Sequence, residues 1–316
     1  MIACITGGAG FIGSEFVRSS INNKFEEFKI YFDKLIVVDS LTYAGNMKNL
    51  GEVINDSKIE FVQADIQNED LMKKIVKNCD LVLNFAAESH VDRSIEKPHN
   101  FIDTNIKGLF SLLEAIRFNN TKRFIQISTD EVYGSILEGS FSEKSYLAPN
   151  SPYSASKAAG DLLVRSYTKT YSLNALITRT CNNFGPYQFP EKLIPVLIKA
   201  ALSNNPLPIY GSGLNEREWI DVHDNCRAIA FLIANENSFD IVNIGSGVIK
   251  SNIAVAQQIL EILSTSTSKI EFVEDRKGHD FRYSLDSSLL KSLGFKLTKG
   301  FNQTLTECIE WYKTNL

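Results

Sequence analysis

Two groups of polar residues in the middle of the chain have the types and spacing for chemistry at a sugar hydroxyl. Thr129, Asp130 and Glu131 follow an apolar stretch, and Tyr153 and Lys157 lie further along, one helical turn apart. A neighbouring ammonium and a positively charged nicotinamide ring favour a phenolate, so we expect the pKa of Tyr153 to fall from its free value of about 10 toward neutrality. Tyr153 could then accept a hydroxyl proton while a hydride leaves the same carbon. Thr129 would hydrogen-bond the reacting hydroxyl, and Lys157 would hold the nicotinamide ribose.

The adjacent carboxyl groups indicate a second reaction. Oxidation or epimerisation at one carbon does not need them, whereas β-elimination needs both a base and an acid. Once C4 of a hexose is a ketone, a carboxylate can remove the acidic C5 proton while a carboxylic acid protonates the departing C6 hydroxyl. Neighbouring carboxyls in a closed site can differ in pKa, which would divide these roles between Asp130 and Glu131. The alternative, from these residues alone, is a solvated acidic loop.

A glycine-rich segment near the start of the chain predicts a dinucleotide site. Gly7, Gly10 and Gly13 follow a short apolar run and open a helical stretch that includes Phe11 and Ile12. Glycines at these positions let the backbone approach a pyrophosphate, whose charge then faces the N-terminus of the helix. The strand-turn-helix context, rather than the glycines alone, makes this prediction specific.

Two acidic residues further along extend the prediction to the adenosine end. Asp39 ends the second apolar run, where a carboxylate accepts hydrogen bonds from the ribose hydroxyls and repels a 2′-phosphate, so NAD is favoured over NADP. Asp65 follows the third run. It is either an adenine contact or the N-cap of the helix expected at Asn68.

Apolar runs and helical stretches alternate through the first half of the chain, which predicts an α/β fold with a Rossmann-like doubly wound parallel sheet. The expected strands are Ile2–Thr6, Leu35–Asp39, Ile59–Ala64, Leu81–Phe85, Phe124–Ser128, Leu173–Thr178 and Ile241–Ile244. The expected helices are Phe11–Asn22, Asn68–Lys77, Asn100–Phe118, Pro152–Tyr171, Val222–Asn235, Asn252–Ser264 and Gln303–Lys313.

Proline and glycine gather after Cys181, which indicates a smaller, discontinuous C-terminal lobe that binds substrate. We expect residues 1–180, with a return segment at about 221–245, to form the NAD-binding domain. Residues 181–220 and 246–316 would then form the nucleotide-sugar-binding lobe.

The bulk composition limits the partners. The 316 residues are 44% hydrophobic and 22% charged, with a net charge of −4, so no nucleic-acid or membrane partner is expected. Five cysteines occur without a metal-binding spacing, and no apolar run approaches the ~20 residues of a membrane helix. No signal-peptide pattern follows Met1. We therefore expect a cytoplasmic protein without a metal, whose anionic ligand is held by local positive charge.

Several segments together resemble a known family. In order, they are ITGGAGFIGS, DSLTYAGN, FAAESHVDRS, ISTDEVYG, SPYSASKA, NNFGPYQFPEKLIP and DRKGHDFRYS. They are similar to the nucleotide-sugar 4,6-dehydratases among the extended short-chain dehydrogenase/reductases, and the similarity covers nearly the whole chain. It implies a hydro-lyase of deoxysugar biosynthesis, such as that of rhamnose, that converts dTDP-glucose to the 4-keto-6-deoxy sugar with NAD regenerated. Tyr153 would be the base at C4, Glu131 the base at C5 and Asp130 the acid at the C6 hydroxyl.

The resemblance also implies ligand contacts by position. Besides the glycines, Tyr153 and Lys157, the cofactor positions are Phe11, Ile12, Asp39, Ser40, Leu41, Thr42, Asp65, Ile66, Ala86, Ala87, Thr104 and Asn183. The substrate positions are Ser89, His90, Thr129, Asn182, Lys192, Leu193, Pro208, Tyr210, Arg217, Asn252, Arg276 and His279. In this family the helices around Asn100–Phe118 and Pro152–Tyr171 pair across a dimer, so a homodimer built through a four-helix bundle is expected.

Three departures from the family pattern bear on specificity. The stretch between Gly134 and Tyr153 is shorter than in many bacterial members, Cys181 stands where serine is common, and Asn243–Ile249 lacks the usual ending. UDP-glucose is therefore the alternative substrate. Two further hypotheses are a 4-epimerase or decarboxylase that uses Tyr153 and Lys157 without the acids, and a non-enzymatic NAD-binding protein.

Overall fold

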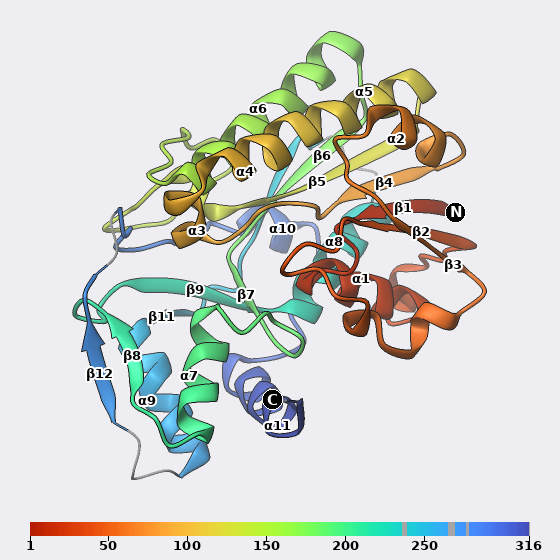
Figure 1. Ribbon diagram of the computed structural model, residues 1–316. Coiled ribbons are helices and arrows are strands. Elements are labelled where there is room, and N and C mark those ends of the chain that lie inside the picture. The colour runs from red at the N-terminus through yellow and green to blue at the C-terminus, as the bar shows by residue number, and fades with distance from the viewer. Residues whose placement is uncertain (236–238, 265–268, 276–277, 316) are drawn as a thin grey trace.

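A parallel sheet at the centre of the molecule is built by the first half of the chain and one later strand (Figure 1). The computed structural model describes residues 1–235, 239–264, 269–275 and 278–315. In these residues the sheet has seven strands in the order β10-β6-β5-β4-β1-β2-β3, and all its neighbouring pairs are parallel. The strands are β1 (Ile2–Thr6), β2 (Lys34–Asp39), β3 (Ile59–Gln63), β4 (Leu81–Asn84), β5 (Arg123–Thr129), β6 (Ala175–Thr180) and β10 (Ile241–Ile244).

The direction of winding changes between β1 and β4, which are neighbours in the sheet but not in the sequence. In open parallel sheets, ligands bind at the carboxyl ends of the strands beside such a switch point. The turn after β1 comes so close to the end of β4 that a Cβ atom at Gly7 would stand 2.5 Å from the Ala86 backbone nitrogen. Gly7 also has φ +67°, so glycine is required there on both grounds.

Helices cover both faces of the sheet and enclose a separate apolar core on each (Figure 1). The face with Phe16, Ile229 and Leu290 is covered by α1 (Phe11–Ile21), α8 (Val222–Ala234) and α10 (Ser288–Ser292). The face with Met72, Leu112 and Val164 is covered by α2 (Glu69–Val76), α5 (Leu109–Asn119) and α6 (Pro152–Tyr171). Two short helices, α3 (Val91–Glu96) and α4 (Pro98–Ile102), precede α5. Burial of the inner strands between these helices explains why their sequences are largely apolar, whereas the edge strand β3 is partly exposed and carries Glu60 and Gln63.

A second group of elements packs around a third apolar core that includes Leu197, Trp219 and Ile309. A three-stranded sheet orders β11 (Ile249–Ser251), β9 (Glu216–Asp221) and β7 (Asn182–Phe184), and β8 (Leu207–Tyr210) pairs with β12 (Ile270–Val273). The helices of this group are α7 (Leu193–Leu202), α9 (Asn252–Leu263) and α11 (Phe301–Asn315). It lies below the carboxyl ends of β5 and β6 in the view of Figure 1.

The predicted fold class is confirmed by this architecture. Most of the predicted elements have an end that differs by one or two residues from the structure, and two of the differences have a clear physical cause or change the element. The strand expected at Leu173–Thr178 is Ala175–Thr180, because α6 ends at Ser172 in a left-handed conformation and the chain needs two further residues to reach the sheet. The single helix expected over Asn100–Phe118 is instead α4, a π-helical turn at Asp103–Gly108 and α5.

Candidate active site

The glycine loop and the first turn of α1 form one wall of a cavity at the switch point. Gly10 precedes α1 with an extended conformation, and a Cβ atom at Gly13 would stand 2.3 Å from the Gly7 carbonyl oxygen. This cavity brings together the loop, the strand ends and the reacting residues. Its lining includes Gly7, Gly10, Phe11, Ile12, Gly13, Ala87, Thr129, Asp130, Glu131, Tyr153, Lys157 and Asn183. We call it the cofactor cavity.

Asp39 anchors the adjoining end of this space. Its side chain is buried and accepts hydrogen bonds from the backbone N–H of Ala9, at 2.9 Å, and of Leu41, at 2.8 Å. Burial raises the pKa of Asp39, and these two backbone donors oppose the rise. Leu41 has φ +52°, which bends the chain around the carboxylate. The predicted cofactor positions that line this end are Gly7, Gly10, Asp39, Ser40, Thr42, Asp65, Ile66, Ala86, Ala87 and Thr104.

Asp65 does not cap α2. Asn68 is the N-cap, because its side chain accepts a hydrogen bond from the Leu71 N–H, whereas Asp65 accepts one from the Gln67 N–H in the preceding turn. The prediction of an N-cap at Asp65 is therefore wrong. Its position on the wall of the adenosine end agrees with a role as an adenine contact.

Tyr153 and Lys157 are placed by the start of α6. Ser151 and Ser154 form a reciprocal capping box, so the helix begins at Pro152 and directs both side chains toward β5. Tyr153 is buried and packs edge-to-face on Phe101. The Lys157 ammonium donates to the Ile127 carbonyl oxygen at 2.7 Å. Burial lowers the pKa of Lys157 to about 8, and the charge of Asp161 opposes this.

The expected fall in the pKa of Tyr153 does not occur in the chain by itself. Burial, and then the charge of Glu131, raise the pKa of Tyr153, while its hydrogen bond with Thr129 acts in the opposite direction. The physical reason is that Lys157 directs its ammonium to a backbone carbonyl, whereas two carboxyl groups lie near the phenol. A phenolate therefore requires further positive charge in the cavity.

Asp130 and Glu131 begin a 3₁₀ turn, Asp130–Tyr133, directly after β5. Thr129 organises the turn, because its hydroxyl accepts from the Glu131 N–H at 3.3 Å and donates to Asp130 Oδ1 at 3.2 Å. Asp130 is only 2% exposed, and its Oδ2 has no hydrogen-bond partner among the described residues. Burial, followed by the charge of Glu131, raises the pKa of Asp130 well above its usual range. A solvated acidic loop is therefore excluded for Asp130.

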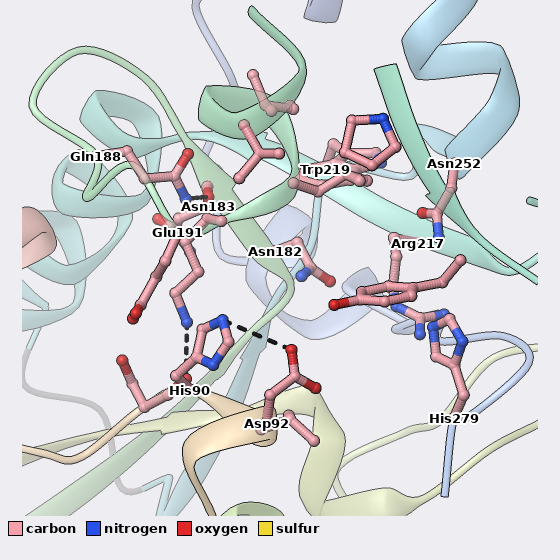
Figure 2. Close-up of a pocket in the computed structure, with 18 of the residues that line it drawn as sticks. His90, Asp92, Asn182, Asn183, Gln188, Glu191, Arg217, Trp219, Asn252 and His279 are labelled. Carbon is pink, nitrogen blue, oxygen red and sulfur yellow. Dashed lines mark hydrogen bonds and ion pairs between the residues drawn. The ribbon is translucent and has the colours of Figure 1, made fainter. Parts of the chain in front are cut away.

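A second cavity adjoins the first and is lined in part by α7, α9, β8 and β9 of the second group of elements. Figure 2 shows residues of its lining. Both cavities are lined by Glu131, so this side chain stands at their junction. The predicted substrate positions that line the second cavity are Ser89, His90, Asn182, Lys192, Leu193, Pro208, Tyr210, Arg217, Asn252 and His279. Thr129 lines the cofactor cavity instead, and Arg276 lies outside the described residues. We call this second space the nucleotide cavity.

Arg217 is a preorganised cation on the wall of the nucleotide cavity. It is 5% exposed, donates to the carbonyl oxygens of Glu216 and Asp280 at 2.7 and 3.0 Å, and stacks on the Tyr283 ring at 4.4 Å. Figure 2 shows it beside His279, whose Nδ1 lies 2.7 Å from Asp275 Oδ1. A guanidinium held in this way can pair with a diphosphate without further ordering of its side chain.

At the opposite side of the nucleotide cavity, Lys192 and His90 lie together. The Lys192 ammonium donates to the Ser89 carbonyl oxygen at 2.8 Å, and the His90 ring lies beside Asp92 (Figure 2). Burial, followed by the charge of Lys192, lowers the pKa of His90. A neutral imidazole and a cation therefore face the space next to Glu131.

Several buried polar atoms in the two cavities have no hydrogen-bond partner among the described residues. They are Asn182 Oδ1, Asn183 Oδ1, Gln188 Oε1, Trp219 Nε1 and Asn252 Oδ1. Buried polar groups are normally satisfied, so a ligand with its own donors and acceptors is the simplest explanation for this group.

Sequence reasoning missed a cluster that includes Glu191, a residue lining both cavities. Arg93 stacks on the Tyr43 ring at 3.8 Å and donates to Glu191 Oε2 at 2.9 Å, while Tyr43 contacts the Phe189 ring. These residues join the segment after β2, helix α3 and the segment before α7. Each belongs to a segment that carries the family resemblance, and that membership was the available signal.

Comparison with known proteins agrees with the geometry. The family model of GDP-mannose 4,6 dehydratase matches residues 4–308. The chain is 48% identical to the low-salt glycan biosynthesis protein Agl12 of Haloferax volcanii, over 99% of this chain and 98% of that protein. It is 44% identical to dTDP-glucose 4,6-dehydratase of Streptomyces niveus, over 98% of this chain and 92% of that protein.

A solved structure is equally similar. DesIV, a dTDP-glucose 4,6-dehydratase of Streptomyces venezuelae solved with NAD and dTDP bound, superposes with a TM-score of 0.96 at 44% identity, covering 100% of this chain and 98% of that one. The chain therefore belongs to the GDP-mannose 4,6 dehydratase family, and the predicted resemblance is confirmed.

No helix in the described part of the chain is long and apolar enough to cross a bilayer. Within the same residues, no group of three His, Cys, Asp or Glu side chains is placed to hold a metal ion.

Proposed function

We propose that this chain is an NAD-dependent 4,6-dehydratase that converts dTDP-glucose to dTDP-4-keto-6-deoxyglucose. The observation that carries the proposal is that a buried Asp130, a junction residue Glu131, Tyr153 and Lys157 line one cavity. The names of relatives at 40–44% identity along nearly the whole chain support dTDP-glucose as the substrate.

The residues present fit NAD. The glycine loop leaves no room for a side chain at Gly7 or Gly13, the N-terminus of α1 faces the cavity, and Asp39 stands where a 2′-phosphate would be repelled. When bound, NAD supplies a hydride acceptor for C4, a hydride donor for C6 and, in its oxidised form, the positive charge that favours a Tyr153 phenolate. We propose that the predicted cofactor positions hold it.

Tyr153 and its neighbours prepare the C4 hydroxyl. Thr129, already hydrogen-bonded to Tyr153, orients this hydroxyl, and the phenolate takes its proton as C4 is oxidised. Lys157 holds the ribose and supplies a cation from a site that excludes water. Because Tyr153 is buried, the proton transfer occurs away from bulk solvent.

Glu131 and Asp130 then remove water across C5 and C6. Glu131 takes the C5 proton, which the C4 ketone has made acidic, and Asp130 gives its proton to the C6 hydroxyl. The structure supports this division, since Asp130 is buried and its raised pKa keeps it protonated, whereas Glu131 reaches into both cavities.

The nucleotide cavity supplies the local positive charge that an acidic chain needs for a diphosphate. Arg217 and Lys192 lie on its walls, and Asn252 and Asn182 offer unsatisfied polar atoms to the substrate. We propose that the C-terminal lobe, predicted as residues 181–220 and 246–316 but without α10, provides most of this site while the remainder provides most of the cofactor site. The role of Arg276 stays a prediction.

The decisive experiment incubates the purified protein with dTDP-glucose and, separately, UDP-glucose, and follows the products by mass spectrometry. We expect dTDP-glucose to lose one water without net formation of NADH. Dehydration of UDP-glucose at the higher kcat/KM would replace dTDP by UDP in the proposal. An epimerised product of unchanged mass would support the 4-epimerase hypothesis, and the absence of any product from a folded, NAD-containing protein would contradict the enzyme proposal.

We also propose a homodimer that pairs α5 and α6 with their copies. These neighbouring helices expose large apolar side chains, with Phe110 45% and Leu162 52% accessible, and Ile102 on α4 adds another. Exposed large apolar side chains on neighbouring helices are typical of a subunit interface. Phe110→Glu and Leu162→Glu should each shift the mass measured by light scattering from a dimer to a monomer. A wild-type chain that is monomeric at micromolar concentration would contradict this.

A further inference from the structure

Besides Asp130 and Glu131, a further carboxyl group, that of the buried Glu218, lies near the proposed catalytic acid. The strand registers place it there. Thr129 of β5 pairs with Thr180 of β6, and Asn182 of β7 pairs with Trp219 of β9. Asp130 follows Thr129, Cys181 lies between Thr180 and Asn182, and Glu218 precedes Trp219, so these registers bring Asp130, Cys181 and Glu218 together. Each of the three is no more than 2% exposed. The carboxyl of Glu218 therefore belongs to the surroundings of Asp130.

Backbone donors hold Glu218 in place. Its Oε1 accepts from the Gly247 N–H and its Oε2 from the Leu285 N–H, both at 2.7 Å. A Cβ atom at Gly245 would stand 2.4 Å from Oε1, so no side chain fits between that strand end and the carboxylate. Burial raises the pKa of Glu218, but these two N–H groups stabilise the charged form and oppose the rise.

The groups that interact electrostatically with Asp130 come from four segments. They are Glu131 on its own turn, Glu218 and Arg217 on β9, Tyr153 on α6, and Cys181 after β6. Among the charged groups, Glu131 and Glu218 raise the pKa of Asp130, and Arg217 lowers it. Burial also raises the pKa of the Cys181 thiol, which keeps this neighbour neutral.

We propose that Glu218 is a positioning residue that keeps Asp130 protonated until its proton is delivered to the departing C6 hydroxyl. This inference rests on the proposed function. In the step it serves, Glu131 takes the C5 proton, and the C5–H electron pair becomes the C5=C6 bond. The C6–O bond breaks with its pair on oxygen, which takes the Asp130 proton and leaves as water. Asp130 regains a proton from solvent, balancing the proton that Tyr153 takes from the C4 hydroxyl and releases. Glu131 returns its proton to C5 when the C5=C6 bond is reduced at C6.

The test is the pH profile of kcat for dehydration of dTDP-glucose. The fall in kcat at high pH, which is the alkaline limb of this profile, should follow the loss of the proton from Asp130. Glu218→Gln removes the neighbouring charge, so the limb should move to lower pH by roughly one unit, with KM nearly unchanged. Glu218→Asp, which retains the charge, should return the limb toward the wild-type position. Glu216→Gln, the matched control, removes an acid two positions away on the same strand and should leave the limb in place.

In Glu218→Gln, the new amide group would face the N–H of Gly247 or Leu285, and the variant could therefore fail to fold. A second measurement covers that case. Infrared difference spectra of wild type and Asp130→Asn, each with its bound NAD, report the protonated Asp130 carboxyl directly, whether or not the sugar turns over. A protonated Asp130 above neutral pH whose titration moves to lower pH in Glu218→Ala, which removes the charge without placing an amide against the Gly247 and Leu285 N–H groups, supports the inference. The inference is overturned if Asp130 is already ionised at neutral pH in the wild type. It is also overturned if Glu218→Gln folds and the alkaline limb of its kcat profile does not move. Failure of the wild type to dehydrate any sugar nucleotide would instead overturn the proposed function.

Discussion

The cofactor cavity and the nucleotide cavity are built in different ways although they share Glu131. The cofactor cavity lies at the carboxyl ends of parallel strands that neighbour one another in a single sheet, and each strand contributes the residues that follow it. The nucleotide cavity is assembled from α7, α9, β8 and β9, together with the segment before α3. The position of the cofactor cavity follows from the strand order of the sheet. The nucleotide cavity depends instead on how the second group of elements packs against the sheet.

The chemical character of the two cavities follows from this difference. Buried titratable groups with shifted pKa values gather in the cofactor cavity, where Asp130, Tyr153 and Lys157 are all under 9% exposed. The nucleotide cavity holds cations and amides fixed by backbone carbonyls, such as Arg217. We therefore expect substitutions in the first cavity to reduce kcat and substitutions in the second to raise KM.

The largest effect should come from Tyr153→Phe. This change removes the proton acceptor while preserving the ring that packs on Phe101, and loss of a general base lowers rates by about 10²- to 10⁴-fold. Steady-state dehydration should fall toward the upper end of that range with bound NAD retained. Tyr167→Phe, the same change further along α6, is the matched control and should leave kcat unchanged. Comparable losses in both variants would mean that the helix, rather than the phenol, is responsible.

Glu131→Gln should separate two steps of the reaction, the oxidation of C4 and the elimination of water. The variant keeps Tyr153 and Lys157, so C4 oxidation should continue, while elimination slows by about 10²-fold because no base removes the C5 proton. Stopped-flow absorbance should show reduced nicotinamide accumulating when dTDP-glucose is added. Glu138→Gln, on the exposed loop after the same turn, should show no accumulation. Unchanged overall turnover in Glu131→Gln would favour chemistry that needs no acid–base pair.

In the nucleotide cavity, Arg217→Lys should raise KM for dTDP-glucose by about tenfold, because the substrate loses one charge-assisted hydrogen bond to the guanidinium. The value of kcat should change far less, because Arg217 does not touch the reacting carbons. Arg282→Lys is the matched control, since Arg282 pairs with Glu216 but does not line the cavity. A large fall in kcat with constant KM in Arg217→Lys would show that the two cavities are not functionally separate.

The same contrast explains how much could be predicted from the sequence. The sheet strands and the residues at their ends are marked by continuous apolar runs, so the fold class, Gly7 and Asp39 could be inferred locally. The strands β7, β8, β9, β11 and β12 carry no such run, because polar residues or a proline interrupt their sequences. The partners of Arg217 and the position of Glu218 depend on pairing between distant segments, which no local pattern encodes.

Asp39→Asn should have the smallest effect, because Asp39 lines a different end of the space from Asp130, Glu131 and Tyr153. Asparagine retains one acceptor oxygen, so one of the two N–H groups now bound by Asp39 faces an amide, and the repulsion of a 2′-phosphate is lost. We expect the preference for NAD over NADP, measured as the ratio of dissociation constants, to narrow by about tenfold, equivalent to about 1.4 kcal/mol. The value of kcat at saturating NAD should stay within about twofold of wild type, since no group near C4, C5 or C6 has changed. Asp56→Asn is the matched control. Asp56 accepts a hydrogen bond from the N–H two residues later, as Asp39 does, but it lies in an exposed turn, so the ratio should stay unchanged. An equal narrowing in both variants would assign the effect to net charge rather than to the position of Asp39 beside the ribose.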